Sequence, residues 1–343
     1  MTLLAYQVST DGENWCTRWE HVPDPVAGQG MVIVAVKAAA LAWSDVLQAT
    51  GRYAGAVPDP PFTSGHEFAG VVIESGQVAE FKPGDRVFGF LPSPGAFCEY
   101  LAVPTRYLHC TPDGLDDITA AALTTSFLTA DVALVTVGGL TPQSTIVVHA
   151  GAGGVGRSAI QLARAYGATQ IIATAGNPVR RADAVDVGAD ICVGYDDFAE
   201  LVAQRTDGRG ADIILESVGG AVFDASARAL APMGRLITIG ASSGQAPGSL
   251  KLPLLWHRSI SVCGLHIARL LDEAPHVLEP SWSRLLPLLT GGAVDAGVGL
   301  VVASDQIDSG IRALTSRAVS GRVVIDFTRG LSPDVNQTEA DKP

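Results

Sequence analysis

The chain has 343 residues, of which 47% are hydrophobic and 17% charged, which allows two packed domains and excludes the disordered class. A net charge of −12, without a cluster of Lys or Arg, argues against nucleic acid or an anionic membrane as the main partner. The sequence shows no basic leader, no apolar run of about 18 residues and no CxxC pair among its five cysteines. We therefore expect a cytoplasmic protein with reduced thiols and a small-molecule substrate.

Residues 1–115 contain short apolar runs broken by Gly and Pro: "LLAYQV", "MVIVAVKAAAL", "HEFAGVVIES", "DRVFGF" and "AFCEYLAV". Runs of that length between turn residues predict an irregular β-rich domain. One short helix is predicted inside it at "SDVLQATG", where Ser44 would cap the start and Gly51 would end the helix.

Residues 145–265 have a different rhythm, in which strand-like runs alternate with segments of helix length. The runs are apolar throughout, as expected of a parallel sheet covered by helices on both faces. They are "TIVVHA", "QIIATA", "DICVGY", "ADIILESV", "RLITIG" and "SISVCGL". The polar tail at residues 331–343 is expected to be disordered.

The first of these strands leads into "GAGGVG", a G-x-G-x-x-G pattern formed by Gly151, Gly153 and Gly156 around Gly154 and Val155. A helix follows, with one apolar face at helical spacing. Glycines let the backbone turn tightly and let a pyrophosphate approach the amide groups at the start of the helix. The bare pattern also occurs in turns that bind nothing, but the strand, loop and helix together predict a dinucleotide site.

The end of the second strand indicates which dinucleotide binds. An NAD site has Asp or Glu there to grip the ribose hydroxyls, but this chain has Ala175, Gly176 and Asn177. Arg180 and Arg181 follow at once, and two guanidinium groups beside an uncharged strand end suit a 2′-phosphate. The arginines would alternatively be a solvated helix face. We interpret the site as one for NADPH.

The sequence resembles the medium-chain dehydrogenase/reductase superfamily, and within it the zinc-free quinone oxidoreductase-like branch, which includes enoyl and alkenal reductases. The resemblance runs from the first strand to about residue 327, on "GHEFAGVV", "FKPGDRVFGF", "GAFCEYLAVP", "AALTTSFLTADVAL", "VHAGAGGVG", "ESVGG" and "GRLITIGASSG". It implies an α/β protein with a GroES-like β-rich catalytic domain, a Rossmann doubly wound domain and an active site in the cleft between them. It also implies a homodimer paired through the strand near "SISVCGLHI".

The resemblance implies the following domain boundaries. A first part of the GroES-like catalytic domain spans residues 1–120, and the Rossmann NADP-binding domain spans residues 121–262. The second part of the catalytic domain spans residues 263–330.

The zinc-dependent relatives bind their metal through two cysteines and a histidine. The positions that match the cysteines are Ala42 and about Thr125, which leaves His66 as the remaining ligand position. A zinc ion needs three or four converging donors, so a lone imidazole does not hold it. Asp45 or Glu67 could in principle complete a site with His66. We interpret His66 as packing against or lining the substrate pocket, with no metal bound.

Without a Lewis acid, a C=C bond conjugated to a carbonyl is easier to reduce than an isolated carbonyl, because charge spreads onto an enolate that one or two hydrogen-bond donors can stabilise. Tyr53 matches a tyrosine in the substrate pocket of the zinc-free relatives, where its hydroxyl would polarise the carbonyl or supply a proton; packing is the alternative role. Ala42 replaces an asparagine often found there. The implied substrate-pocket residues are therefore Ala42, Tyr53 and His66.

Four further residues match cofactor-binding positions of the family. The resemblance places Thr129 near the nicotinamide and Tyr195 near the adenosine phosphate, and it places the segments of Gly240 and Leu265 beside the nicotinamide. The sequence thus predicts a zinc-independent NADPH-dependent oxidoreductase that transfers a hydride to a quinone or to the C=C of an α,β-unsaturated carbonyl compound. The alternatives are a reductase of C=O or C=N bonds and a cofactor-binding protein with little turnover. The sequence does not identify the substrate.

Overall fold

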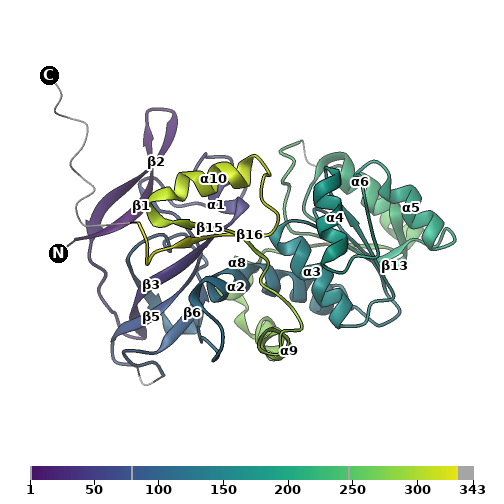
Figure 1. Ribbon diagram of the computed structural model, residues 1–343. Helices are drawn as coiled ribbons and strands as arrows, with labels where there is room; N and C mark the ends of the chain where they lie inside the picture. The colour runs from purple at the N-terminus through teal and green to yellow at the C-terminus, as the bar shows by residue number, and fades with distance from the viewer. Residues whose placement is uncertain (1, 79, 246–247, 331–343) are drawn as a thin grey trace. The chain divides into compact units, whose positions relative to one another are not determined.

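The computed structural model describes residues 2–78, 80–245 and 248–330, which form two compact units (Figure 1). Of the described residues, those up to 124 and those from 298 to 330 form the first unit, and those from 125 to 297 form the second. A β-rich unit and a unit with a parallel sheet confirm the predicted fold class. The tail expected to be disordered, at residues 331–343, lies outside the described residues.

The first unit is built on two β-sheets. A three-stranded sheet has the order β2-β1-β4, and a seven-stranded sheet has the order β15-β16-β3-β5-β6-β8, with β7 paired to β3. The elements are β1 (Thr2–Asp11), β2 (Asn14–Pro23), β3 (Met31–Leu41), α1 (Trp43–Gln48), β4 (Phe62–Thr63), β5 (Glu67–Ser75), β6 (Arg86–Phe90), β7 (Tyr100–Pro104), η1 (Thr105–Tyr107), β8 (Leu108–Cys110), β15 (Val298–Ala303), η4 (Ser304–Gln306), α10 (Ile307–Thr315) and β16 (Arg322–Asp326).

The two separated parts of the chain in the first unit are joined in the middle of the large sheet. Strand β16 pairs antiparallel with β3, which brings Val323 opposite Leu41. Beside this pairing, Arg322 donates a hydrogen bond to the carboxylate of Glu67 at the start of β5, and both side chains are buried. Because an unpaired buried charge is costly, this ion pair fixes the register between segments 255 residues apart.

The second unit is built on a six-stranded sheet with the order β11-β10-β9-β12-β13-β14, in which every pair is parallel. This is the strand order of a dinucleotide-binding doubly wound fold. The elements are α2 (Asp117–Asp131), which begins in the first unit, η2 (Val132–Val137), β9 (Thr145–Val148), α3 (Gly154–Ala165), β10 (Gln170–Thr174), α4 (Pro178–Asp186), β11 (Ile191–Val193), α5 (Phe198–Arg205), β12 (Ala211–Glu216), α6 (Gly220–Ala229), β13 (Leu230–Thr238), α7 (Leu252–Arg258), β14 (Ser261–Gly264), α8 (Ile267–Glu273), η3 (Pro275–Val277) and α9 (Glu279–Thr290).

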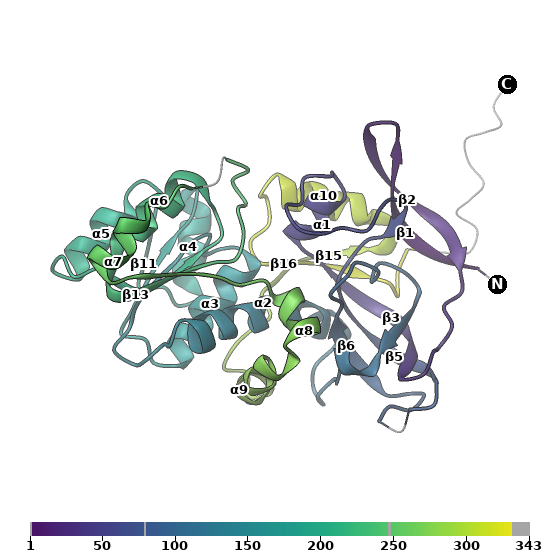
Figure 2. The same cartoon turned by 180° about the vertical axis from the view of Figure 1, so that it is seen from behind.

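One face of this parallel sheet is covered by α5, α6 and α7, which Figure 2 shows together at the end of the unit. The buried side chains that join them to the sheet include Val147, Ile172, Ile214 and Leu236 from four neighbouring strands. The side chains that these strands bury under the helices are apolar, as predicted for a parallel sheet with covered faces.

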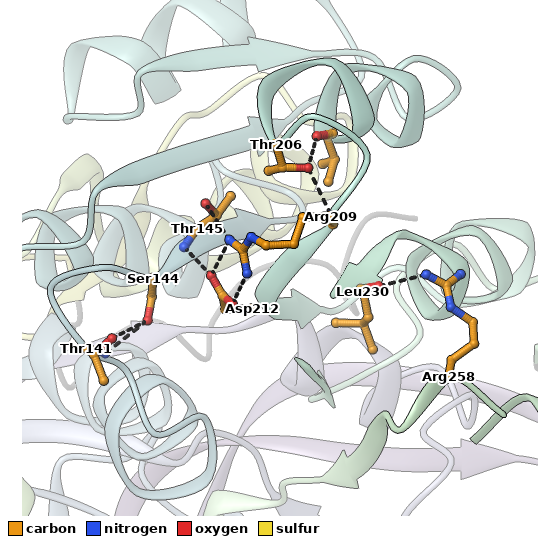
Figure 3. A network of polar contacts seen from close by, with 10 residues as sticks. Thr141, Ser144, Thr145, Thr206, Arg209, Asp212, Leu230 and Arg258 are labelled. Atoms are coloured by element: carbon orange, nitrogen blue, oxygen red, sulfur yellow. Dashed lines mark hydrogen bonds and ion pairs between the residues drawn. The ribbon is translucent and has the colours of Figure 1, made fainter. Parts of the chain in front are cut away.

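A polar network fastens the amino ends of the two central strands (Figure 3). The guanidinium group of Arg209 donates to both carboxylate oxygens of Asp212 on β12, at 2.5 and 2.9 Å. Asp212 Oδ2 also accepts the backbone N–H of Thr145 on β9 at 2.8 Å. This edge of the sheet is therefore occupied by internal contacts, and the opposite edge, at the carboxyl ends of the strands, carries the loops of interest.

The expected return to the catalytic domain at residue 263 differs from the structure, where residues 263–297 belong to the second unit. Strand β14 is the last strand of the parallel sheet, and Arg284 on α9 forms an ion pair with the buried Asp131 on α2 at 2.5 Å. Asp295 and Gln161 on α3 exchange two hydrogen bonds, at 2.7 and 3.0 Å. These contacts bind residues 263–297 to the second unit, and the chain returns to the first unit at the start of β15.

The continuous helix over Asp117–Val137 is long and apolar enough to cross a membrane by length and composition alone. Within the protein, however, 78% of its most apolar window is buried. A core helix of a globular protein passes the same test. The last six residues of this helix, Val132–Val137, have π-helical hydrogen bonding, a local widening that often occurs at functional sites.

Candidate functional site

The glycine-rich turn after β9 has the geometry that close approach of a phosphate requires. Gly153 is the extended N-cap of α3 and has no side chain to cap the first amide groups of the helix. A Cβ on Gly156 would lie 2.3 Å from the carbonyl oxygen of Ala150, and one on Gly151 would lie 2.9 Å from Ala173 Cβ. These glycines are therefore required by backbone packing, and the turn fits a pyrophosphate at the helix N-terminus.

The parallel sheet brings the predicted cofactor residues of the second unit to one edge. Because all of its strands are parallel, the residues that follow them lie at the carboxyl edge, where doubly wound folds bind ligands. Ala175, Gly176 and Asn177 follow β10, and Tyr195 follows β11. Gly240 follows β13, and Leu265 follows β14. Thr129 is placed apart from this row, as a buried residue of α2.

Side chains converge at the carboxyl end of β10. The amide oxygen of Asn177 accepts the backbone N–H of Arg180 at 2.9 Å and so caps α4. Arg181 folds back to donate from Nε to the carbonyl oxygen of Ala175 at 3.1 Å. A Cβ on Gly176 would lie 3.9 Å from the ring of Tyr195, so this ring borders the same strand end. The described site thus has a half-buried guanidinium group beside the strand end and no carboxylate at Ala175, Gly176 or Asn177.

In the first unit, Ala42 is the N-cap of α1, so the helix starts earlier than the sequence predicted. Ser44 was expected to cap the helix, but the helix begins at Trp43. The carboxylate of Asp45 accepts the backbone N–H of Ala42 at 2.7 Å, so Asp45 has the reciprocal capping role. Burial raises the pKa of Asp45 to about 7.

The imidazole of His66 has hydrogen-bond partners at both ring nitrogens. Nδ1 lies 2.9 Å from the carbonyl oxygen of Leu91, which accepts only, so Nδ1 carries the proton and donates. In the neutral ring Nε2 is then an acceptor, and it faces the amide nitrogen of Gln48 at 3.0 Å. Burial lowers the pKa of His66, which keeps the ring neutral. Asp45 Oδ1 lies 4.0 Å from Nε2.

A catalytic zinc ion does not fit this corner of the first unit. Ala42 offers no donor, and Nε2 of His66 already has a hydrogen-bond partner in Gln48. Glu67 does not complete a site, because its carboxylate is paired with Arg322. Across residues 2–78, 80–245 and 248–330, no group of three or more His, Cys, Asp and Glu side chains is arranged to hold a metal ion. A zinc ion needs three or four converging donors, and His66 has too few such donors around it.

Tyr53 lies in the loop between α1 and β4 and is half-buried. Burial, together with the nearby carboxylate of Asp45, raises the pKa of its hydroxyl. The phenol therefore stays protonated at neutral pH and can donate a hydrogen bond. The structure thus places Ala42, Tyr53 and His66 around α1 in the first unit, while the predicted cofactor residues belong to the second unit.

Known proteins resemble the chain in both units. Residues 28–113 match the model of the alcohol dehydrogenase GroES-like domain, and residues 154–291 match that of the zinc-binding dehydrogenases, a range that contains neither Ala42 nor His66. The quinone oxidoreductase of Thermus thermophilus, solved also with NADPH, is 32% identical, with a TM-score of 0.81, over 94% of this chain and 100% of that one.

The chain belongs to the quinone oxidoreductase-like medium-chain dehydrogenases/reductases.

Two other known proteins are similar to the chain over most of its length. The CurK enoyl reductase is 25% identical, with a TM-score of 0.82, over 94% of this chain and 99% of that chain. A mycocerosic acid synthase-like polyketide synthase of Mycobacterium tuberculosis is 33% identical over 94% of this chain. The chain spans 15% of that synthase's length.

Two features of the site were missed in the sequence. Arg181 was considered with Arg180, but only the structure shows its guanidinium group turned back onto the end of β10. Glu216, the last residue of β12, was given no role, although it ends a strand at the ligand edge of the sheet. A charged residue directly after the apolar residues 213–215 was the available signal.

Proposed function

We propose that this oxidoreductase uses NADPH to reduce quinones or the C=C bond of α,β-unsaturated carbonyl compounds, without a metal ion. The observation that carries the proposal is the environment of His66, whose ring nitrogens face Leu91 and Gln48. Because no Lewis acid is available from such a donor set, an acceptor that delocalises its own charge is favoured. The similarity to a quinone oxidoreductase and to an enoyl reductase supports the same acceptor class.

When bound, NADPH supplies the hydride. The chain's own residues hold the cofactor and stabilise the charge that develops on the acceptor. The turn from Gly151 to Gly156 would receive the pyrophosphate, and Arg180 and Arg181 would meet the 2′-phosphate. The hydroxyl of Tyr53 would donate to the oxygen of the forming enolate, because its raised pKa keeps it protonated.

Purified protein should oxidise NADPH readily with quinones and conjugated enones, and much more slowly with unconjugated ketones and imines. This order is expected because a ketone's developing alkoxide has no metal ion to compensate it. Initial rates of NADPH oxidation, followed by absorbance before and after dialysis against a chelator, test the expectation. Preference for ketones, or loss of activity on chelation that added zinc restores, would show that the proposed function is wrong.

Removing the guanidinium groups at the end of β10 should erase the preference for NADPH over NADH. We expect wild type to favour NADPH by at least about tenfold in kcat/KM, because one charge-assisted contact contributes about 1.5–3 kcal/mol. Arg181→Ala and Arg180→Ala should each reduce this ratio, with little change for NADH. Arg205→Ala, an exposed arginine at the end of α5, is the matched control. An unchanged ratio in the double variant would reject the assignment of this strand end.

Tyr53→Phe should lower kcat on the order of 10²-fold and change KM much less, because a hydrogen bond to the enolate oxygen strengthens only in the transition state. Phenylalanine keeps the ring, so a packing role would leave kcat unaffected. Stopped-flow rates under single turnover separate the chemical step from product release. Tyr100→Phe, an exposed tyrosine of β7, serves as the control. A wild-type rate for Tyr53→Phe with a true substrate would remove the hydroxyl from the mechanism.

A further inference from the structure

Glu216 places a carboxylate with no solvent exposure at the carboxyl end of β12. Its Oε1 accepts the backbone N–H groups of Val218 and Gly219, both at 2.6 Å. Its Oε2 lies 3.3 Å from the hydroxyl of Thr238, the last residue of the neighbouring strand β13. One side chain therefore holds the turn that follows β12 and connects it to the end of β13.

Backbone hydrogen bonds extend this connection to the other loops of the same half of the sheet. The N–H of Ser242 donates to Ser217 O at 2.9 Å, and the N–H of Ser243 donates to Val218 O at 3.0 Å. Past β14, the N–H of Leu265 donates to Thr238 O at 3.0 Å. The loops after β12, β13 and β14 are thus connected by hydrogen bonds. Glu216 contributes to this connection by accepting two amides of the loop after β12.

The turn held by Glu216 also has backbone geometry that few other sequences could adopt. Gly219 and Gly220 have φ angles of +80° and +58°, and a Cβ on Gly219 would lie 3.1 Å from Ala241 Cβ. A Cβ on Gly220 would lie 2.5 Å from Gln245 Oε1. Glycine loses more conformational entropy on folding than other residues, and the two hydrogen bonds of the carboxylate would help to offset this cost in the turn.

The topology assigns these loops to one half of a dinucleotide. In a doubly wound fold the pyrophosphate binds at the glycine turn after the first strand, here β9, and each half of the sheet serves one nucleotide. Arg181 and Tyr195, which we propose for the 2′-phosphate end, lie in the segments that follow β10 and β11, on one side of β9. The nicotinamide half therefore falls to the loops after β12, β13 and β14.

We propose that Glu216 is a positioning residue for the nicotinamide half of the cofactor, because it preorganises the loops after β12 and β13 that would border the ring. The inference rests on the proposed function as an NADPH-dependent enzyme. Glu216 itself does not touch the ligand, since its carboxylate is enclosed by its own turn. Without this carboxylate, the loops would have to become ordered when the ligand binds. This ordering cost would lower the affinity only of ligands that contact these loops.

Two ligands separate this role from general stability. NADP⁺ spans both halves of the site, whereas 2′,5′-ADP contains only the adenosine half with its 2′-phosphate. By isothermal titration calorimetry, Glu216→Leu should weaken NADP⁺ binding by at least about tenfold and leave 2′,5′-ADP within about twofold of wild type. Glu216→Gln should stay close to wild type for both, because its amide oxygen can still accept both N–H groups while its NH₂ donates to Thr238.

A control variant comes from the same strand. Asp212, at the amino end of β12, also accepts a backbone N–H, from Thr145 at 2.8 Å, but it lies at the opposite edge of the sheet (Figure 3). Asp212→Leu should therefore leave the ratio of the two affinities unchanged. If Glu216→Leu fails to fold, Glu216→Met takes its place, because its thioether fills a similar space and is at most a weak acceptor for the two amides, and the same selective loss is expected.

The outcomes distinguish the two levels of the proposal. Equal weakening of NADP⁺ and 2′,5′-ADP, or no weakening of either, would overturn the positioning role of Glu216 while leaving the proposed function intact. The same holds if Glu216→Gln behaves like Glu216→Leu, because charge and not loop geometry would then matter. A wild-type protein that binds neither ligand would reject the proposed cofactor, and the positioning role with it.

Discussion

The close contact between Gly156 and Ala150 governs the architecture of the second unit at its functional edge. A side chain at residue 156 would collide with the carbonyl oxygen of Ala150 at 2.3 Å, so glycine is required for the first turn of α3 to pack against the short loop that follows β9. With the helix placed there, its amide groups and the carboxyl ends of six parallel strands lie at one edge. The residues that we propose for the 2′-phosphate lie after strands on one side of β9, and the loops joined by Glu216 lie after strands on the other, so both sets flank this turn.

The first unit supplies the complementary constraint, which is a missing donor set. Its fold keeps a buried histidine beside an acidic residue, as a metal site would need, but the ring of His66 is bound to Leu91 and Gln48. The surrounding charges are also committed, since Glu67 pairs with Arg322 across the sheet. The phenol of Tyr53, whose pKa is raised by burial and by Asp45, stays protonated at neutral pH. A single neutral donor suits an acceptor that forms a delocalised enolate.

The sequence predicted those parts of the fold whose signals are local. The glycine spacing and the apolar strands sit within short windows, and both were found where predicted. The cap of α1 was predicted at Ser44 because serine is a common cap, but the helix begins at Trp43, and the carboxylate of Asp45 accepts the backbone N–H of Ala42. The end of the second unit was also missed, because the ion pair between Arg284 and Asp131 joins residues 153 positions apart.

In the candidate site, too, local features were predicted from the sequence and contacts between distant residues were not. The pattern of small residues at Ala175 to Asn177 was readable, but the turn of Arg181 toward Ala175 is a side-chain conformation that no local pattern encodes. The partners of His66 come from α1 and from the residue after β6, so its neutral, occupied state follows only from their meeting in space. The role proposed for Glu216 also depends on a contact between distant residues, since the amides that it bonds lie in the turn after β12 and the hydroxyl of Thr238 lies at the end of β13.

The destination of the hydride tests the central claim most directly. The protein would be given NADPH carrying deuterium at C4 of the nicotinamide, in turn on each face, together with a conjugated enone, and the product would be examined by mass spectrometry and NMR. The account predicts deuterium from one face only, on the carbon β to an intact carbonyl group. Deuterium on a carbinol carbon would contradict it, because the chain would then reduce C=O bonds with the donor set described around His66 and Tyr53.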